Sequence, residues 1–126
     1  MYQPTVLIVE DEILIRLALA DTFVDGGYHV VEAANVLEAV AVLANRKIDA
    51  IVTDVDMPGA LSGLDLAEMV STTQLKVPLI IASGRHRLTG EGLPGNAVFV
   101  PKPYAMDVIV AMVDQLTGSA LSRLTA

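Results

Sequence analysis

Five continuous apolar runs lie along the chain, and between them apolar residues recur at the spacing of helices. Strands buried on both faces of a parallel sheet are continuous in this way, whereas half-exposed strands alternate with polar residues. Because these runs alternate with helical stretches, the pattern predicts a doubly wound α/β domain. The runs that we interpret as strands cover residues 5–9, 29–33, 49–54, 77–83 and 97–101.

Helices are predicted wherever apolar residues return every three or four positions. Gly26 and Gly27 stop the first such stretch, Asn35 precedes the second as an N-cap, and Gly118 closes the last. The residues that define the four stretches are Ile13, Leu17, Ala20 and Val24; Val36, Val40 and Leu43; Leu64, Ala67 and Val70; and Ile109, Met112, Val113 and Leu116.

One segment, residues 84–96, breaks this alternation. It contains four glycines and one proline and has almost no helical periodicity. The alternating order calls for a fourth helix there, and we predict that it is short or irregular. Residues 1–126 are expected to form a single domain, with a core of about 5–117 and a frayed tail over 118–126.

Composition narrows the class of protein. Of the 126 residues, 53% are hydrophobic and 18% are charged, which is enough apolar material for one real core. The net charge of −7 argues against direct binding to nucleic acid or anionic membranes, because phosphate groups attract Lys and Arg. There is no cysteine, and no apolar run approaches the roughly 18 residues of a membrane span, so we expect a cytoplasmic protein.

Polar residues follow four of the five predicted strands. In an open α/β sheet, ligands bind beyond the carboxyl ends of the strands, so these residues are expected at one edge. Each alone is an ordinary turn residue, helix cap or surface group, but their coincidence at consecutive strand ends predicts a functional site. They are Glu10, Asp11 and Glu12 after the first strand, Asp54 at the third, Ser83 at the fourth and Lys102 after the fifth.

The charges of this edge indicate its chemistry. Carboxylates crowded together repel one another unless cations intervene, and Lys102 supplies only one positive charge. Oxygen ligands without Cys or His favour Mg²⁺ as the second cation. An aspartate beside a hard cation, a lysine and a hydroxyl suits phosphoryl transfer, with the carboxylate as the nucleophile.

At this point the chain resembles the receiver domain of bacterial two-component response regulators over residues 5–117. The resemblance rests on four motifs in order: LIVEDE, IVTDVDMPG, IIASG and FVPKPY. It implies a flavodoxin-like sheet with strand order 2-1-3-4-5. It also implies a stand-alone receiver, acting by protein contact or as a relay; a piece of a larger regulator or hybrid kinase is the alternative.

The same resemblance implies roles for the acidic residues. Asp54 corresponds to the phosphoacceptor, and Mg²⁺ would be held by Glu10, Asp11, Asp54 and the backbone carbonyl of Asp56. The Asp56 side chain would remain free at the mouth of the site. We expect it to pair with Arg85 and to tune the access of water to the phosphoryl group.

The remaining implied roles concern the response to phosphorylation. Ser83 and Lys102 correspond to the residues that contact the phosphoryl group, and Lys102-Pro103 to a cis peptide. Phe99 corresponds to a switch aromatic that turns inward as Ser83 moves, although an aromatic residue on a strand is equally often part of the core.

The implied function is a phosphorylation-dependent switch of a protein-interaction surface, not an enzyme beyond self-catalysed phosphotransfer and dephosphorylation. A sensor histidine kinase or phosphotransfer protein would donate the phosphoryl group, and the downstream partner is an unknown protein. The chain would bind neither nucleic acid nor membrane directly. Val110 in the apolar last helix is expected to face outward, which favours a possible homodimer or partner docking there.

Three other functions remain to be weighed. A receiver fold can signal through protein contacts without phosphorylation. The Asp54-x-Asp56 pair also occurs in haloacid-dehalogenase-type phosphatases, but their late acidic pair has no clear counterpart, because only Asp107 and Asp114 follow Lys102. A flavodoxin would need a phosphate-binding loop after the first strand, where this chain is acidic. Sustained turnover of a phosphomonoester would favour the phosphatase, and a bound yellow flavin the flavodoxin.

Overall fold

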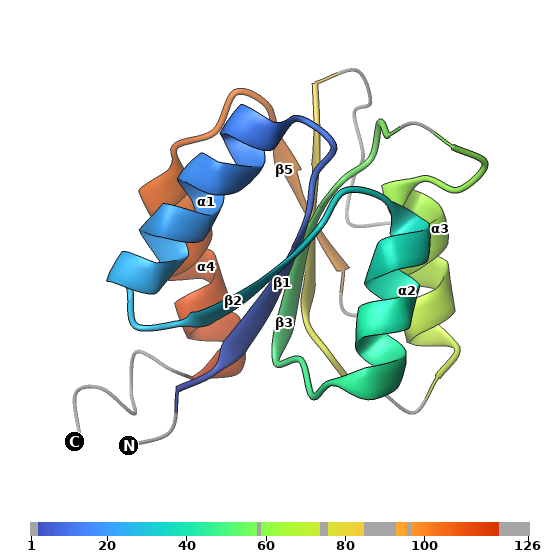
Figure 1. The fold of residues 1–126 in the computed structure, drawn as a ribbon, viewed down its shortest axis with the longest axis horizontal. Coiled ribbons are helices and arrows are strands. Elements are labelled where there is room, and N and C mark those ends of the chain that lie inside the picture. The colour runs from blue at the N-terminus through green and yellow to red at the C-terminus, as the bar shows by residue number, and fades with distance from the viewer. Residues whose placement is uncertain (1–2, 58, 74–75, 85–92, 96, 119–126) are drawn as a thin grey trace.

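The computed structural model describes residues 3–57, 59–73, 76–84, 93–95 and 97–118, which form one sheet of five strands and four helices. All neighbouring strands are parallel, in the order β2-β1-β3-β4-β5 (Figure 1). The predicted fold class and strand order are therefore confirmed. The elements are β1 Thr5–Val9, α1 Ile13–Asp25, β2 His29–Ala33, α2 Val36–Asn45, β3 Ala50–Asp54, α3 Gly63–Ser71, β4 Leu79–Ser83, β5 Ala97–Pro101 and α4 Met106–Thr117.

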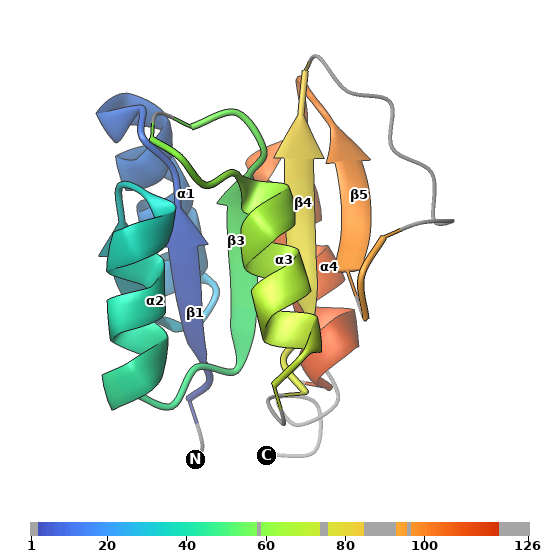
Figure 2. The same ribbon diagram turned by 90° about the vertical axis from the view of Figure 1, so that its right-hand side faces the viewer.

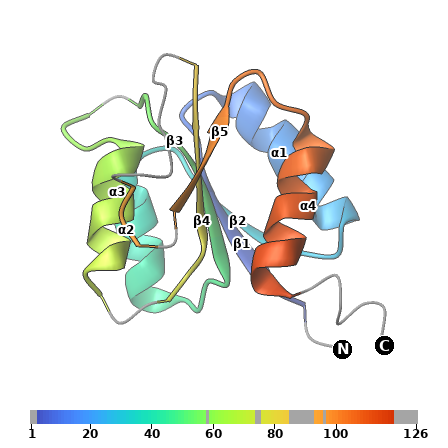
Figure 3. The same cartoon turned by 180° about the vertical axis from the view of Figure 1, so that it is seen from behind.

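Two helices cover each face of the sheet, α1 and α4 on one side and α2 and α3 on the other (Figures 1 and 3). Alternate residues of each strand therefore enter two separate apolar cores. On β1, Val6 and Ile8 belong to the core beneath α1 and α4, whereas Leu7 and Val9 belong to the core beneath α2 and α3. All four are essentially inaccessible to solvent, which explains why the strand is a continuous apolar run.

Local polar contacts define the helix ends. The Asn35 side chain accepts a hydrogen bond from the Glu38 backbone N–H at 2.9 Å, so the predicted N-cap of α2 is confirmed. At α3, Ser62 and Asp65 form a capping box in which each side chain accepts from the other's backbone N–H. Gly118 ends α4 with φ of 73°, a left-handed conformation that favours glycine.

The prediction for α1 is right about the helix but not about its buried face. Of the four residues that defined this helix, Ile13, Leu17 and Val24 are about half exposed and only Ala20 is buried. The other buried residues of α1 are Leu19 and Phe23. The helix carries apolar residues around its whole circumference, so spacing alone could not identify the side that packs on the sheet.

The prediction that Val110 faces outward is wrong. Val110 is only 9% exposed and belongs to the core beneath α1 and α4, together with Ile109 and Val113. These three residues occupy one side of α4, since at about 100° per residue they point within an arc of about 100°. The exposed valine of this helix is Val108, at 50%.

Two expectations fall largely on residues that the structure does not describe. The irregular fourth helix was predicted within 84–96, of which 85–92 and 96 lie outside the described residues. The predicted tail lies outside them as well, apart from Gly118. Among the helices that are described, each is too short to span a bilayer.

Candidate functional site

The parallel sheet brings the predicted polar residues to one edge. Figure 2 shows the arrowheads of β1, β3, β4 and β5 pointing the same way, and the residues in question lie at these ends. Glu10 follows β1, Asp54 and Ser83 are the last residues of β3 and β4, and Lys102 follows β5. The register pairs Asp54 with Ala82, next to Ser83, and Ser83 with Pro101, next to Lys102.

Three carboxylates form the centre of this edge. One carboxylate oxygen each from Glu10, Asp11 and Asp54 lies within 4.8 Å of the other two. Glu10 and Asp54 are buried, at 2% and 6% exposure, whereas Asp11 is exposed and opens the cluster to solvent. The Oδ1 atom of Asp54 is buried and accepts no hydrogen bond from the described residues. A buried oxygen that accepts no such hydrogen bond, among hard anionic ligands, fits a divalent cation such as Mg²⁺.

Lys102 supplies a positive charge in direct contact with this cluster. Its Nζ lies 3.2 Å from Asp54 Oδ1 and 3.7 Å from Glu10 Oε2. The first contact is an ion pair whose geometry falls short of a hydrogen bond. Among the described residues, one ammonium therefore faces three carboxylates, which leaves this part of the site with an excess of negative charge.

The pKa values follow from this imbalance. Burial, together with the nearby Asp54 carboxylate, raises the pKa of Glu10 to about 7. Burial also raises the pKa of Asp54, although the Lys102 ammonium opposes the shift. For Lys102, burial alone would lower the pKa, but attraction to Glu10 and Asp54 outweighs it and raises the value. Lys102 is thus a cation at neutral pH, and Glu10 exchanges a proton there unless a metal cation displaces it.

The backbone around Asp54 is tightly held. Thr53 Oγ1 donates to the Asp54 carbonyl at 3.0 Å, and Val55 N–H donates to the Ala82 carbonyl at 3.0 Å. Gly63, the first residue of α3, packs so closely on the Asp54 carbonyl that a Cβ would overlap it. Sequence reasoning missed Gly63, although a glycine at a helix start, where other residues form helices better, was an available signal.

The structure also places the residues implied in switching. Ser83 is buried, and its backbone carbonyl accepts from Lys102 N–H at 2.9 Å. The Lys102-Pro103 peptide is cis, as predicted. Phe99 is neither fully buried nor exposed and lies opposite Ile81 in the register, so its two predicted roles both stay open.

The predicted tuning pair is only half described. Asp56 is partly exposed and lies two residues beyond the end of β3, as expected for a residue at the mouth of the site. Arg85 lies outside the described residues, so the Asp56–Arg85 pair stays a prediction.

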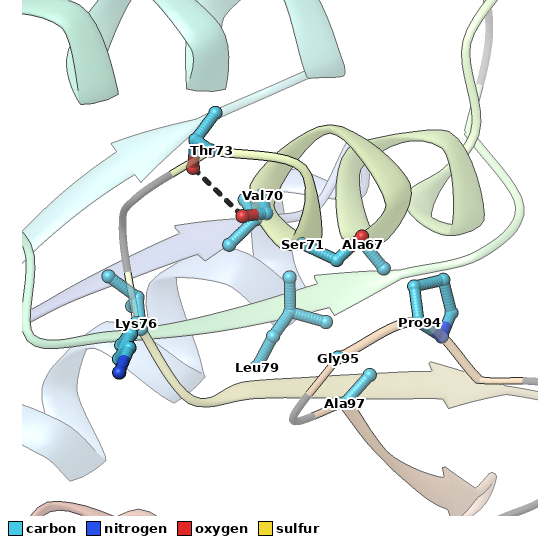
Figure 4. A pocket seen from close by; sticks show the side chains of 10 residues that line it. Ala67, Val70, Ser71, Thr73, Lys76, Leu79, Pro94, Gly95 and Ala97 are labelled. Atoms are coloured by element: carbon cyan, nitrogen blue, oxygen red, sulfur yellow. Dashed lines mark hydrogen bonds between the residues drawn. The ribbon is translucent and has the colours of Figure 1, made fainter.

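A separate hollow lies between the end of α3 and the starts of β4 and β5 (Figure 4). Its floor is apolar and includes Val70 and Leu79, and Lys76 is the one charged residue among the described residues that line it. The Thr73 hydroxyl at its rim donates to the Val70 carbonyl at 2.8 Å. The described residues that line this hollow include no group of ionisable side chains comparable with the carboxylate cluster.

Comparison with known proteins gives a consistent result. A family model described as response regulator receiver domain matches residues 6–114. Response regulator MprA of Mycobacterium sp. (strain KMS) is 31% identical over 114 residues, and the phosphate regulon transcriptional regulatory protein PhoB of Pseudomonas aeruginosa is 36% identical over 116 residues. Both matches cover 88% of this chain but 49% and 50% of those proteins, so the chain spans about half their length.

Solved structures share the fold. The response regulator protein TrrA from Thermotoga maritima, in complex with Mg(2+)-BeF, superposes with a TM-score of 0.80 at 24% identity. The match covers 90% of this chain and 99% of that one.

Proposed function

Because the chain belongs to the response regulator receiver family, we propose that it is a phosphorylation-dependent switch in which Asp54 accepts the phosphoryl group. The observation that carries the proposal is the state of the Asp54 carboxylate. Its Oδ1 is buried, accepts no hydrogen bond from the described residues, and lies 3.2 Å from Lys102 Nζ. A buried anionic oxygen that accepts no hydrogen bond from the described residues and lies beside a cation is arranged to act as a nucleophile.

The proposed donor is a phosphohistidine of a sensor histidine kinase or phosphotransfer protein. An oxygen of Asp54 attacks the phosphorus, the new P–O bond forms as the P–N bond breaks, and the electron pair of that bond returns to the imidazole nitrogen. Later attack by water on the phosphorus releases inorganic phosphate and regenerates the carboxylate. The chain would thus act as a regulator whose only catalysis is on itself.

The carboxylates of Glu10, Asp11 and Asp54, with the backbone carbonyl of Asp56, would hold Mg²⁺. When bound, the cation would offset negative charge on the phosphoryl oxygens. Lys102 supplies the second positive charge, since its ammonium is already paired with Asp54. The carboxylate cluster and the likeness to TrrA, a response regulator protein in complex with Mg(2+)-BeF, support this part of the proposal.

The switch would begin with these contacts. New negative charge on Asp54 would attract the Lys102 ammonium and the Ser83 hydroxyl, and the partly exposed Phe99 could follow into the space that Ser83 leaves. The result would be a changed interaction surface for a downstream protein or a second copy of the chain. Under this proposal the chain acts in the cytoplasm.

The experiment is incubation with a small phosphodonor and Mg²⁺, followed by intact-mass measurement. We expect one phosphoryl group on the wild-type chain and none on Asp54→Asn. Asp56→Asn is the matched control, because it makes the same chemical change two residues away and should still be modified. Modification of Asp54→Asn would refute the assignment, and no uptake by the wild-type chain would favour an interaction module without phosphorylation.

A further inference from the structure

The side chain of Arg16 joins helix α1 to the edge of the sheet that carries the carboxylates. Its Nε lies 3.0 Å from Glu32 Oε1 on β2, and its Nη1 donates to the backbone carbonyl of Glu10 at 2.8 Å. Only 15% of the Arg16 side chain is exposed, and its contact with the Glu10 carbonyl is partly buried, whereas the Glu32 side chain, at 37%, lies at the surface. A guanidinium that is mostly buried and shared between two acceptors is fixed in position.

The carbonyl that Arg16 holds has a particular place in the site. It belongs to the peptide group that joins Glu10 to Asp11, the two consecutive residues of the carboxylate cluster. On the N-terminal side of Glu10, its backbone N–H donates to the Ala33 carbonyl at 3.0 Å. The turn after β1 is therefore anchored to β2 at one end of Glu10 and to α1, through Arg16, at the other.

We propose that Arg16 is a positioning residue for the metal site, and that Glu32 holds it in place. The orientation of the peptide between Glu10 and Asp11 sets the directions in which both side chains leave the backbone. Metal ligands must be held to within about 0.5 Å, so loss of this anchor weakens metal binding without removing any ligand. The inference rests on the proposed Mg²⁺ site.

Arginine is suited to this task in a way that lysine is not. The planar guanidinium presents Nε and Nη1 in a fixed fork, and its two acceptors lie in separate segments, Glu32 on β2 and Glu10 in the turn after β1. An ammonium at residue 16 would preserve the charge but would not hold both acceptors at once. A comparison of the wild-type chain with Arg16→Lys therefore separates the effect of positioning from that of electrostatic attraction.

The test is an Mg²⁺ titration followed by backbone amide NMR, without any phosphodonor. We expect Arg16→Lys to weaken Mg²⁺ binding about fivefold to tenfold and Glu32→Ala about threefold. Arg46→Gln is the control for net charge, because Arg46 is exposed at the end of α2, and it should change the affinity less than twofold. Urea denaturation of each variant without metal measures the effect on the fold separately.

Two results would overturn the inference: an unchanged Mg²⁺ affinity in Arg16→Lys, or an unchanged Mg²⁺ affinity in Glu32→Ala. Glu32→Ala alters an exposed side chain, so it should still fold if Arg16→Lys does not. Mg²⁺ binding by the wild-type chain without phosphoryl uptake would overturn only the proposed function. If the wild-type chain binds no Mg²⁺ at millimolar concentrations, both are overturned.

Discussion

Replacing Gly63 by alanine should destabilise the fold and disturb Asp54 together. A Cβ at residue 63 would lie 2.9 Å from the carbonyl carbon of Asp54, 3.1 Å from Val55 Cα, and closer still to the Asp54 carbonyl oxygen. All three atoms belong to the backbone of the central strand or its continuation, so no side-chain rotation relieves the overlap. Either α3 moves outward or the Asp54 peptide shifts.

The magnitude follows from two opposing effects. Overpacking of a well-packed interior costs about 1–3 kcal/mol, and the upper end applies where backbone must move. Alanine in place of glycine in a helix returns at most about 1 kcal/mol. The net loss in free energy of unfolding is therefore about 2 kcal/mol, which lowers the urea midpoint by about 1 M for a slope of about 2 kcal/mol/M.

Urea denaturation followed by circular dichroism measures this loss, and intact-mass phosphorylation measures the effect on Asp54. Gly84→Ala is the matched control, since the nearest atom of the described residues to its Cβ, apart from its chain neighbours, would be Lys102 Cβ at an ordinary 3.6 Å. We expect that variant to lose less than about 0.5 kcal/mol, as surface substitutions do. Equal stability of Gly63→Ala and Gly84→Ala would refute the argument from close packing.

Three further predictions concern the site and the helices. The pKa of Glu10 rises from 4.5 to about 7 on folding, so the metal-free fold retains a proton that the unfolded chain releases. The free energy of unfolding of the metal-free chain should therefore fall between pH 4.5 and 7, by at most about 3 kcal/mol, and Mg²⁺ should stabilise the chain more at pH 8 than at pH 5. This pH dependence should shrink in Glu10→Gln. Its persistence in that variant would contradict the assignment. Ser62→Ala should lose about 1 kcal/mol in urea denaturation, because it removes half of the capping box of α3; an unchanged midpoint would show that the cap contributes little. On α1, Leu19→Ala should lose about 2–5 kcal/mol and Leu14→Ala less than about 0.5 kcal/mol, since their exposures are 1% and 80%, and similar losses would contradict the assigned buried face.

Much of the fold was predictable because one physical feature recurs. Strands buried on both faces must be almost entirely apolar, so the inner strands β1, β3 and β4 appear in the sequence as nearly continuous apolar runs. The edge strands β2 and β5 are partly exposed, and β2 carries the polar residues His29 and Glu32, but all five strands lie within about two residues of their predicted bounds. The strand order came from the resemblance to a family, since apolar runs do not say which strands are neighbours. The buried face of α1 was not predictable, because its apolar residues surround the helix and only packing on the sheet selects Leu19 and Phe23.

The functional site, like the fold, was predictable from the sequence only in part. Its carboxylates and lysine were predictable, because parallel topology places all strand ends at one edge. The residues that hold these side chains in place were not predictable, because they act through contacts between segments distant in sequence. Arg16 reaches a strand sixteen residues away at Glu32, and Gly63 meets the backbone of Asp54, and neither contact leaves a periodic signal in the chain.

The position of β3 gives the site parts of unequal mobility. β3 is the middle strand, paired on both sides, and all five of its residues are buried. Its amide hydrogens should therefore exchange with solvent only when the whole domain opens. β5 is an edge strand with partly exposed residues, and it leads directly to Lys102. Asp54, the proposed nucleophile, thus lies on the strand that is most protected from local opening. Lys102, the cation that would respond to phosphorylation, follows an edge strand that can open locally at a lower cost in free energy.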